Sequence, residues 1–155
     1  NLILFHRIVK KFKLSNYFKS VAIRPGKPIL FARIKGKQKA IFGLPGNPIS
    51  SAACFRFFVY PFLLESLGLK KEKIIKATLK NGFIKKKNFT RFLKSKFYTT
   101  NNGKIEVEIL NGQESFRIKS FIKSNSWVLL PPGKSKFKKG DLVDCFFQNQ
   151  PNKFF

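Results

Sequence analysis

The chain has 155 residues, enough for one ordinary domain or two small ones, and 43% of them are hydrophobic, so a packed core is expected. Its net charge is +25, from 32 Lys and Arg against 7 acids. The lysines are spread along the whole chain, which indicates compositional drift, although this charge also fits a nucleic-acid-binding module. Because the chain begins with Asn1 and contains no Met, we expect further residues upstream.

Cysteine and histidine usage excludes one common kind of metal site. Cys54 and Cys145 are far apart and His6 is the only histidine, so a zinc site of the usual Cys/His kind cannot form. Two buried free thiols are expected, which fits a reducing cytoplasm. The longest apolar run, at 52–64, is interrupted by Arg56 and is shorter than the ~20 residues of a membrane span. No membrane contact is therefore expected.

The first part of the chain is predicted to contain strands. Apolar residues at helical spacing in residues 2–13 indicate the end of a helix. Apolar segments separated by glycine and proline turns then predict strands at 17–23, 29–34 and 39–42.

A long helix is predicted next, after a glycine turn. Asn47 is a favoured N-cap and Pro48 suits the first helical position, so the helix is expected to run from Pro48 to about residue 67. Gly68 can adopt the left-handed conformation that ends a helix. Pro61 lies inside the helix and is expected to kink it or to restart its last turns.

The second part is predicted to be a small antiparallel β-barrel or sandwich. Asn101-Asn102-Gly103 is a hairpin signal, and 105–109 alternates apolar and acidic residues as a half-buried strand does. The expected fold class is therefore α/β followed by all-β, divided into residues 1–72, residues 73–150 and a tail, 151–155. The first two parts are expected to form separate cores, with few apolar contacts between them. The expected strands are 74–79, 89–98, 105–110, 127–130 and 142–147.

Two turns suit the binding of an oxyanion. Gly43-Leu44-Pro45-Gly46-Asn47-Pro48 precedes a helix, whose free amides and dipole could cradle a phosphate, but it also fits a plain strand-to-helix turn. In the turn 24–28, Arg24 and Lys27 flank Pro25-Gly26 and could hold a tetrahedral dianion, although an ordinary exposed turn fits as well. The acids lie away from these turns in sequence, so no catalytic residue and no metal ligand is assigned.

Taken as a pair, the segments Ala22-Ile23-Arg24-Pro25-Gly26-Lys27-Pro28 and Phe42-Gly43-Leu44-Pro45-Gly46-Asn47-Pro48-Ile49-Ser50 resemble the signature of the molybdopterin molybdotransferase (MoeA) family, which includes the C-terminal domain of gephyrin. The resemblance covers about residues 12–147. Weaker matches lie at 59–63, 112–115, 126–131 and 140–143.

The resemblance implies the end of a molybdopterin-binding α/β domain followed by a small C-terminal β-barrel. It implies insertion of molybdate into adenylylated molybdopterin, with Mg²⁺ bound mainly by segments outside this chain. The family's upstream segment with its aspartates has no counterpart here, so the active site is expected to be incomplete.

The family's site residues transfer by position. Arg24 replaces a more usual lysine, and Lys86 stands for a usual arginine, although Lys85 or Lys87 could also be aligned there. The residues implied to bind molybdate are Arg24, Lys27, Pro28, Lys86, Arg91 and Ser115. Those implied to bind molybdopterin or its phosphate are Gly43, Leu44, Pro45, Gly46, Asn47 and Ser50.

The resemblance also implies a cytoplasmic homodimer that contacts the molybdopterin adenylyltransferase and binds no nucleic acid. Two alternatives stay open: a non-enzymatic basic nucleic-acid-binding module, and a scaffold used for protein binding.

Overall fold

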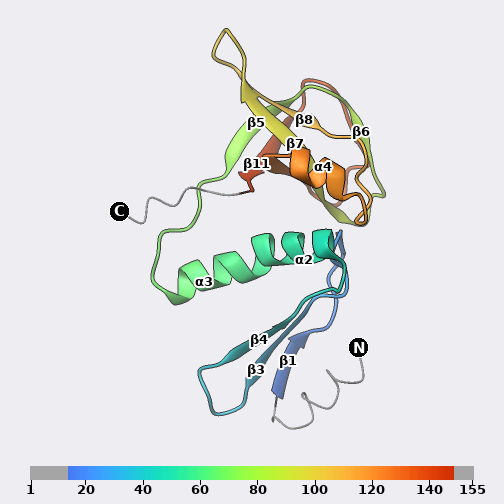
Figure 1. Cartoon of the computed structure of the whole chain (residues 1–155). Coiled ribbons are helices and arrows are strands. Elements are labelled where there is room, and N and C mark those ends of the chain that lie inside the picture. The colour runs from blue at the N-terminus through green and yellow to red at the C-terminus, as the bar shows by residue number, and fades with distance from the viewer. Residues whose placement is uncertain (1–13, 149–155) are drawn as a thin grey trace.

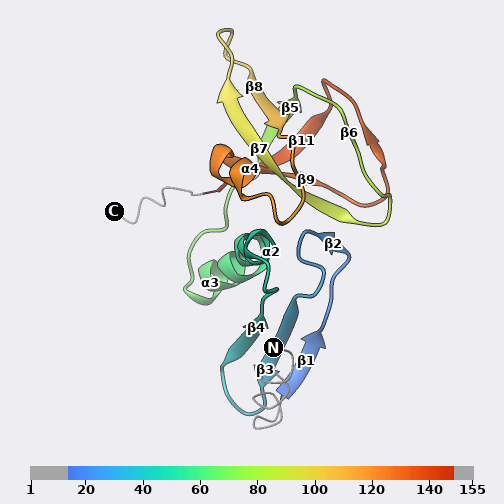
Figure 2. The same cartoon turned by 45° about the vertical axis from the view of Figure 1, so that its right-hand side comes forward.

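The computed structural model describes residues 14–148, in which an α/β part is followed by a barrel (Figures 1 and 2). The helix predicted in 2–13 and the tail 151–155 lie outside the described residues. The α/β part contains a three-stranded antiparallel sheet of order β1–β3–β4. The strands are β1 (Leu14–Phe18), β3 (Leu30–Ile34) and β4 (Ala40–Gly43).

The strand predicted at 17–23 is wrong, whereas those at 29–34 and 39–42 are confirmed to within one residue. The β1–β3 register shifts between Asn16 and Phe18, and β1 ends there. The chain then leaves this sheet and forms a two-residue strand, β2 (Ile23–Arg24), on the barrel. Because that pairing is with a distant segment, the local residue pattern could not indicate it.

The predicted helix is present, with a π-helical turn in its middle. It consists of α2 (Pro48–Cys54), η1 (Phe55–Val59) and α3 (Tyr60–Ser66), and Asn47 caps its start. Pro61 lies in the first turn of α3, so the predicted restart of the last turns is confirmed. Gly68 has φ 66°, the left-handed conformation expected after a helix.

The second part is a closed barrel. The sheet order is β2–β7–β8–β5–β11–β9, and an additional β7–β9 pairing closes the ring. All strands predicted for this second part are found to within one residue. However, β5 and β8 pair in parallel, so the predicted purely antiparallel arrangement is wrong. The barrel strands are β5 (Ile75–Leu79), β7 (Thr90–Thr99), β8 (Ile105–Ile109), β9 (Ser126–Leu130) and β11 (Leu142–Phe147).

Three short elements of the second part were not predicted from the sequence. Strands β6 (Phe83–Ile84) and β10 (Lys136–Phe137) pair with each other beside the barrel. Helix α4 (Ile118–Lys123) lies between β8 and β9 in the chain. These elements are too short to show a clear apolar period.

The expectation of two separate cores is wrong. The interior of the barrel has its own cluster, which includes Leu93 and Val107. A second cluster joins Ala53 of α2 to Phe92 and Trp127 on the barrel strands. Because Phe92 and Leu93 are adjacent in β7, they face opposite sides of the strand, and both sides are buried. The helix therefore packs between the three-stranded sheet and the barrel (Figure 1). The boundary near residue 72 remains a prediction.

Arg56 forms a polar link across the same interface. It is 7% exposed, its Nε donates to the carbonyl of Phe147 in β11 at 2.9 Å, and its guanidinium pairs with Glu72. On the helix, Phe57 stacks on Phe92 with ring centroids 3.9 Å apart. The π-helical turn thus presents one cation and one aromatic ring to the barrel.

Cys54 and Cys145 are buried free thiols, as predicted. Burial raises the pKa of each thiol to about 11. Within residues 14–148, no helix combines the length and apolarity needed to cross a membrane.

Candidate anion-binding site

The turn 24–28 is attached to the barrel through β2. Ile23 and Arg24 pair in parallel with Thr90 and Arg91 at the start of β7 (Figure 2). The Thr90 amide also donates to the carbonyl of Ala22 at 3.0 Å. Two arginines that are far apart in sequence therefore lie side by side.

The same turn is held against helix α2 through Gly26. The Cys54 thiol donates to the Gly26 carbonyl at 3.5 Å, and a Cβ on Gly26 would stand 2.5 Å from Cys54 Sγ. Gly26 also has φ 104°, which side chains disfavour. The turn is closed by the amide of Val21, which donates to the carbonyl of Lys27 at 3.0 Å. The two turns that form the sequence signature are therefore brought together by contact between the first turn and the helix after the second.

Positive charge is concentrated where β2 meets β7. Burial, and then the neighbouring charge of Arg24, lowers the pKa of Arg91. Burial and the charge of Arg91 likewise lower the pKa of Lys85. Among the described residues, the buried Arg91 Nε has no hydrogen-bond partner. Three cations and an unpartnered buried donor are an arrangement that a bound anion would stabilise.

The Lys85 and Arg24 side chains are oriented by the segment that leads into β7. Lys85 Nζ donates to the carbonyl of Phe89 at 2.8 Å and to that of Lys86 at 3.4 Å. The Arg24 guanidinium carbon lies 5.0 Å from the centroid of the Phe89 ring. Phe89 thus contacts two of the three cations.

Four other residues belong to the predicted molybdate set, and Arg24 itself is exposed. Lys27, Pro28 and Lys86 are exposed, and Ser115 is half-buried in the loop between β8 and α4. Among the described residues, no hydrogen bond joins Ser115 to the cations. Lys85, not the adjacent Lys86, is the lysine coupled to Arg91. Because Lys85, Lys86 and Lys87 are consecutive, no feature of the sequence distinguishes Lys85 from the other two.

The glycine turn before α2 has the predicted architecture. Gly43 ends β4, and Asn47 Oδ1 accepts hydrogen bonds from the amides of Ile49 at 3.2 Å and Ser50 at 3.4 Å. Two amides of the first helical turn are therefore already bonded to the Asn47 side chain. A phosphate at this turn would contact the remaining backbone groups of the turn instead. Gly46 is exposed, and a Cβ added to it would have nothing within 4 Å, so a ligand has access to its backbone. Leu44 is exposed, Pro45 half-buried and Ser50 buried.

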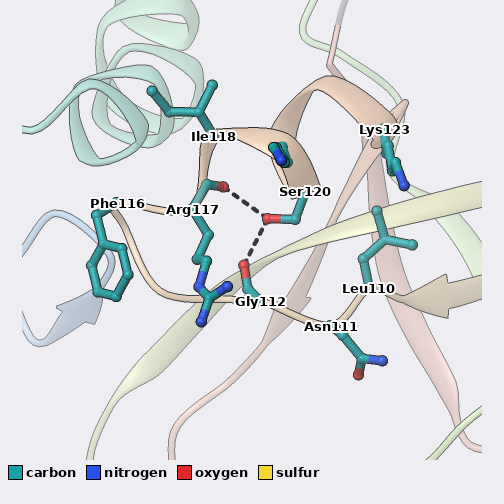
Figure 3. Close-up of a pocket in the computed structure, with 9 residues that line it drawn as sticks. Leu110, Asn111, Gly112, Phe116, Arg117, Ile118, Ser120 and Lys123 are labelled. Atoms are coloured by element: carbon teal, nitrogen blue, oxygen red, sulfur yellow. Dashed lines mark hydrogen bonds between the residues drawn. The ribbon is translucent and has the colours of Figure 1, made fainter.

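A concave region lies beside the Ser115 loop. Its cavity of about 650 Å³ is lined by the loop and by α4, and three cations border it. Figure 3 shows the Ser120 hydroxyl between the carbonyls of Gly112, at 2.6 Å, and Arg117, at 2.8 Å, so its one hydrogen can be donated to either. The lining residues are Leu110, Asn111, Gly112, Phe116, Arg117, Ile118, Lys119, Ser120 and Lys123.

The acids of the described chain do not fit a magnesium site. Within residues 14–148 no group of three His, Cys, Asp or Glu side chains could hold a metal ion. Most acids pair with a cation instead, as Asp141 does with Lys134 at 2.6 Å and Glu108 with Lys80 at 3.1 Å. We therefore derive no chemical step through Mg²⁺ for this chain.

Two family models match the chain. The model described as "Probable molybdopterin binding domain" matches residues 6–65, and "MoeA C-terminal region (domain IV)" matches residues 76–146. Together they span both parts of the fold.

Relatives match along most of the chain. The molybdopterin molybdenumtransferase of Staphylococcus aureus (strain COL) is 36% identical over 139 residues, covering 88% of this chain and 32% of that protein. That of Staphylococcus epidermidis is 33% identical over 149 residues, covering 95% of this chain and 35% of that protein. The chain thus spans about a third of the length of these relatives.

Solved structures share the fold. The molybdopterin biosynthesis MoeA protein from Pyrococcus horikoshii superposes with a TM-score of 0.69 at 29% identity, over 97% of this chain and 36% of that one. A molybdenum cofactor biosynthesis protein from Pyrococcus furiosus superposes with a TM-score of 0.71 at 19% identity, over 94% and 54% of the two chains. The two family models, with the staphylococcal relatives and the Pyrococcus horikoshii structure, show that the chain belongs to the MoeA family and joins part of a molybdopterin-binding domain to a barrel that corresponds to domain IV.

Proposed function

We propose that this chain forms the molybdate-binding part of a molybdopterin molybdenumtransferase, which inserts molybdate into adenylylated molybdopterin during molybdenum cofactor biosynthesis. The observation that carries the proposal is the pairing of Arg24 with Arg91 across β2 and β7, next to Lys85. Both arginines were named by the family resemblance, and they come from parts of the chain that only the fold brings together.

The cation cluster suits molybdate because molybdate is a tetrahedral dianion. Guanidinium groups offer several N–H donors in a rigid plane, and such charge-assisted bonds are short and strong. The unpartnered Nε of Arg91 supplies one donor that is already desolvated. In this proposal Lys27 adds charge from the turn, Pro28 restricts the backbone beside it, and Ser115 donates a hydroxyl. Lys86 adds positive charge at the edge of the cation cluster, and Lys85 adds a third positive charge beside the two arginines.

The molybdopterin substrate is proposed to bind at the glycine turn. Exposed Gly46 leaves its backbone accessible there, and the N-terminus of α2 favours a negative group. The groups assigned to molybdopterin and its phosphate are Gly43, Leu44, Pro45, Gly46, Asn47 and Ser50. The Mg²⁺ ion, the homodimer and the contact with the molybdopterin adenylyltransferase are proposed for the full-length protein.

The test is a titration of this chain with sodium molybdate at fixed ionic strength, monitored by isothermal titration calorimetry. Because a hydrogen bond to a charged group contributes about 1.5–3 kcal/mol, Lys27→Ala is expected to weaken molybdate binding ~10-fold or more. The matched control is Lys136→Ala, which removes another exposed lysine, on β10. It should leave the affinity nearly unchanged. Equal losses in the two variants would mean diffuse attraction to a basic protein and would refute the site.

A further inference from the structure

A lysine inside the barrel wall carries three hydrogen bonds to one loop. Lys94, on β7, is 1% exposed. Its Nζ donates to the carbonyls of Gly112 at 2.7 Å, Glu114 at 3.1 Å and Arg117 at 3.2 Å. An ammonium group has three donors, so each N–H has an acceptor. The acceptors are the backbone of the loop that bears Ser115.

The loop is tied from a second side by Ser120. Its hydroxyl lies within hydrogen-bond distance of the carbonyls of Gly112 and Arg117, the same two that accept from Lys94 (Figure 3). The hydroxyl has one hydrogen, so it donates to one of these carbonyls at a time and adds a second bridge at that end of the loop 112–117. A carbonyl oxygen has two lone pairs, so the two donors complement each other.

The loop is also connected to the backbone of Lys94. The Lys94 amide donates to Gln113 Oε1 at 2.9 Å, and Gln113 Nε2 donates to the Lys94 carbonyl at 2.8 Å and to the Leu110 carbonyl at 2.6 Å. The loop is therefore anchored to β7 by hydrogen bonds to both the backbone and the side chain of Lys94.

Apolar burial does not account for the shape of this loop. Glu114, Phe116 and Arg117 are exposed, and Ser115 is half-buried. Burying a lysine ammonium is unfavourable, and burial is the largest cause that lowers the pKa of Lys94. An apolar residue at this position would avoid that penalty but would deprive three carbonyls of a donor. The lysine is thus explained by the loop that it holds.

We propose that Lys94 is the positioning residue of the 112–117 loop, and that it acts on oxyanion binding by fixing the place of the Ser115 hydroxyl. The part that concerns Ser115 rests on the proposed function. The part that concerns the loop rests on the hydrogen bonds alone, so the two parts are tested separately.

The first measurement is backbone dynamics by NMR in Lys94→Met, which keeps an unbranched side chain but removes the three donors. The matched control is Lys96→Met, on the same strand, whose side chain is exposed. In Lys94→Met the order parameters of residues 114–117 are expected to fall from about 0.85, the rigid value, to below about 0.6. In Lys96→Met they should stay at the parent value. Unchanged order parameters in Lys94→Met would overturn the proposal.

The second measurement is a double-mutant cycle on molybdate affinity, with Lys94→Met, Ser115→Ala and the double variant. If Lys94 acts through Ser115, the double variant should bind no more weakly than Ser115→Ala, so the two losses are not additive. Additive losses would show that Lys94 acts elsewhere and would overturn its role in binding. A Ser115→Ala variant that keeps parent affinity would refute the assignment of Ser115 and leave the result on loop order standing. If Lys94→Met does not fold, Lys94→Gln, which retains amide donors, replaces it in both measurements with smaller expected changes.

Discussion

The contact between the turn 24–28 and helix α2 can be tested with Gly26→Ala. The added Cβ would stand 2.5 Å from Cys54 Sγ and 3.3 Å from Ile23 Cδ1, at φ 104°. The left-handed backbone disfavours a side chain by about 1–2 kcal/mol, and overpacking adds about 1–3 kcal/mol, so the free energy of unfolding should fall by about 2–5 kcal/mol. Urea unfolding followed by fluorescence measures the loss, because Trp127 is the only tryptophan and is 2% exposed in the cluster that includes Ile23 and Cys54.

Two further variants separate the clash from the backbone effect. Gly36→Ala has a similar backbone, at φ 72°, but its Cβ would have nothing within 4 Å, so only the loss of about 1–2 kcal/mol is expected. Combining Gly26→Ala with Cys54→Ala removes the sulfur that clashes. The loss of unfolding free energy in the double variant should therefore be about 1 kcal/mol smaller than the sum of the losses in the two single variants. If Gly26→Ala loses no more than Gly36→Ala, and no coupling to Cys54 is found, the turn is not held by this contact.

Three further predictions concern the scaffold. Arg56→Met should lower the free energy of unfolding by about 3 kcal/mol, because it breaks the buried ion pair with Glu72 and the hydrogen bond to Phe147 of the barrel, whereas exposed Lys71→Met should change it little in the same urea assay. Asn47→Ala should remove about 1 kcal/mol of helix capping, measured against exposed Asn88→Ala, and equal stabilities would contradict the capping. Burial raises the pKa of the Cys145 thiol to about 11, so the unfolded chain releases this proton first and stability should be lost as the pH rises from 9.0 to about 11. Cys145→Ala should show a smaller fall over that range.

The sequence predicted elements well where the signals were local. Asn47 and Pro48 act within one helical turn, and the helix begins where they predict. Alternation at Ile105–Ile109 reflects the two faces of a single strand, and β8 has those bounds. Signals of this kind depend on neighbouring residues alone, which explains why they could be interpreted without the fold.

Errors arose where distant segments decide the structure. β2 exists because Ile23 and Arg24 meet β7, and no property of residues 17–23 alone indicates this. Separate cores were expected, but Phe92 is buried by the helix while its neighbour Leu93 is buried inside the barrel. That arrangement also accounts for part of the high phenylalanine content by packing, which does not favour the nucleic-acid-binding alternative.

The candidate site was predictable only through the family resemblance. Physical reasoning on the turn 24–28 could not distinguish an anion site from an exposed turn, since the second arginine, Arg91, lies on another element. Lys85 was named only as an alternative to Lys86, and Lys94 was missed, because a lysine gives no sign in sequence of whether it is buried. Their burial depends on β6 and on the 112–117 loop, elements without a strong local pattern.

The short strand β2 has a consequence for how the protein acquires its site. Ile23 and Thr90 are far apart along the chain, so their pairing closes a long loop, and loops of that length close late compared with local hairpins and helices. The arginine pair therefore cannot exist in a chain whose barrel has not formed, even if the turn 24–28 and helix α2 are already in contact. We expect the barrel to fold without the turn, but the turn to need the barrel. The concentration of positive charge at one point is then a property of the finished fold, which a misfolded or partly synthesised chain would lack.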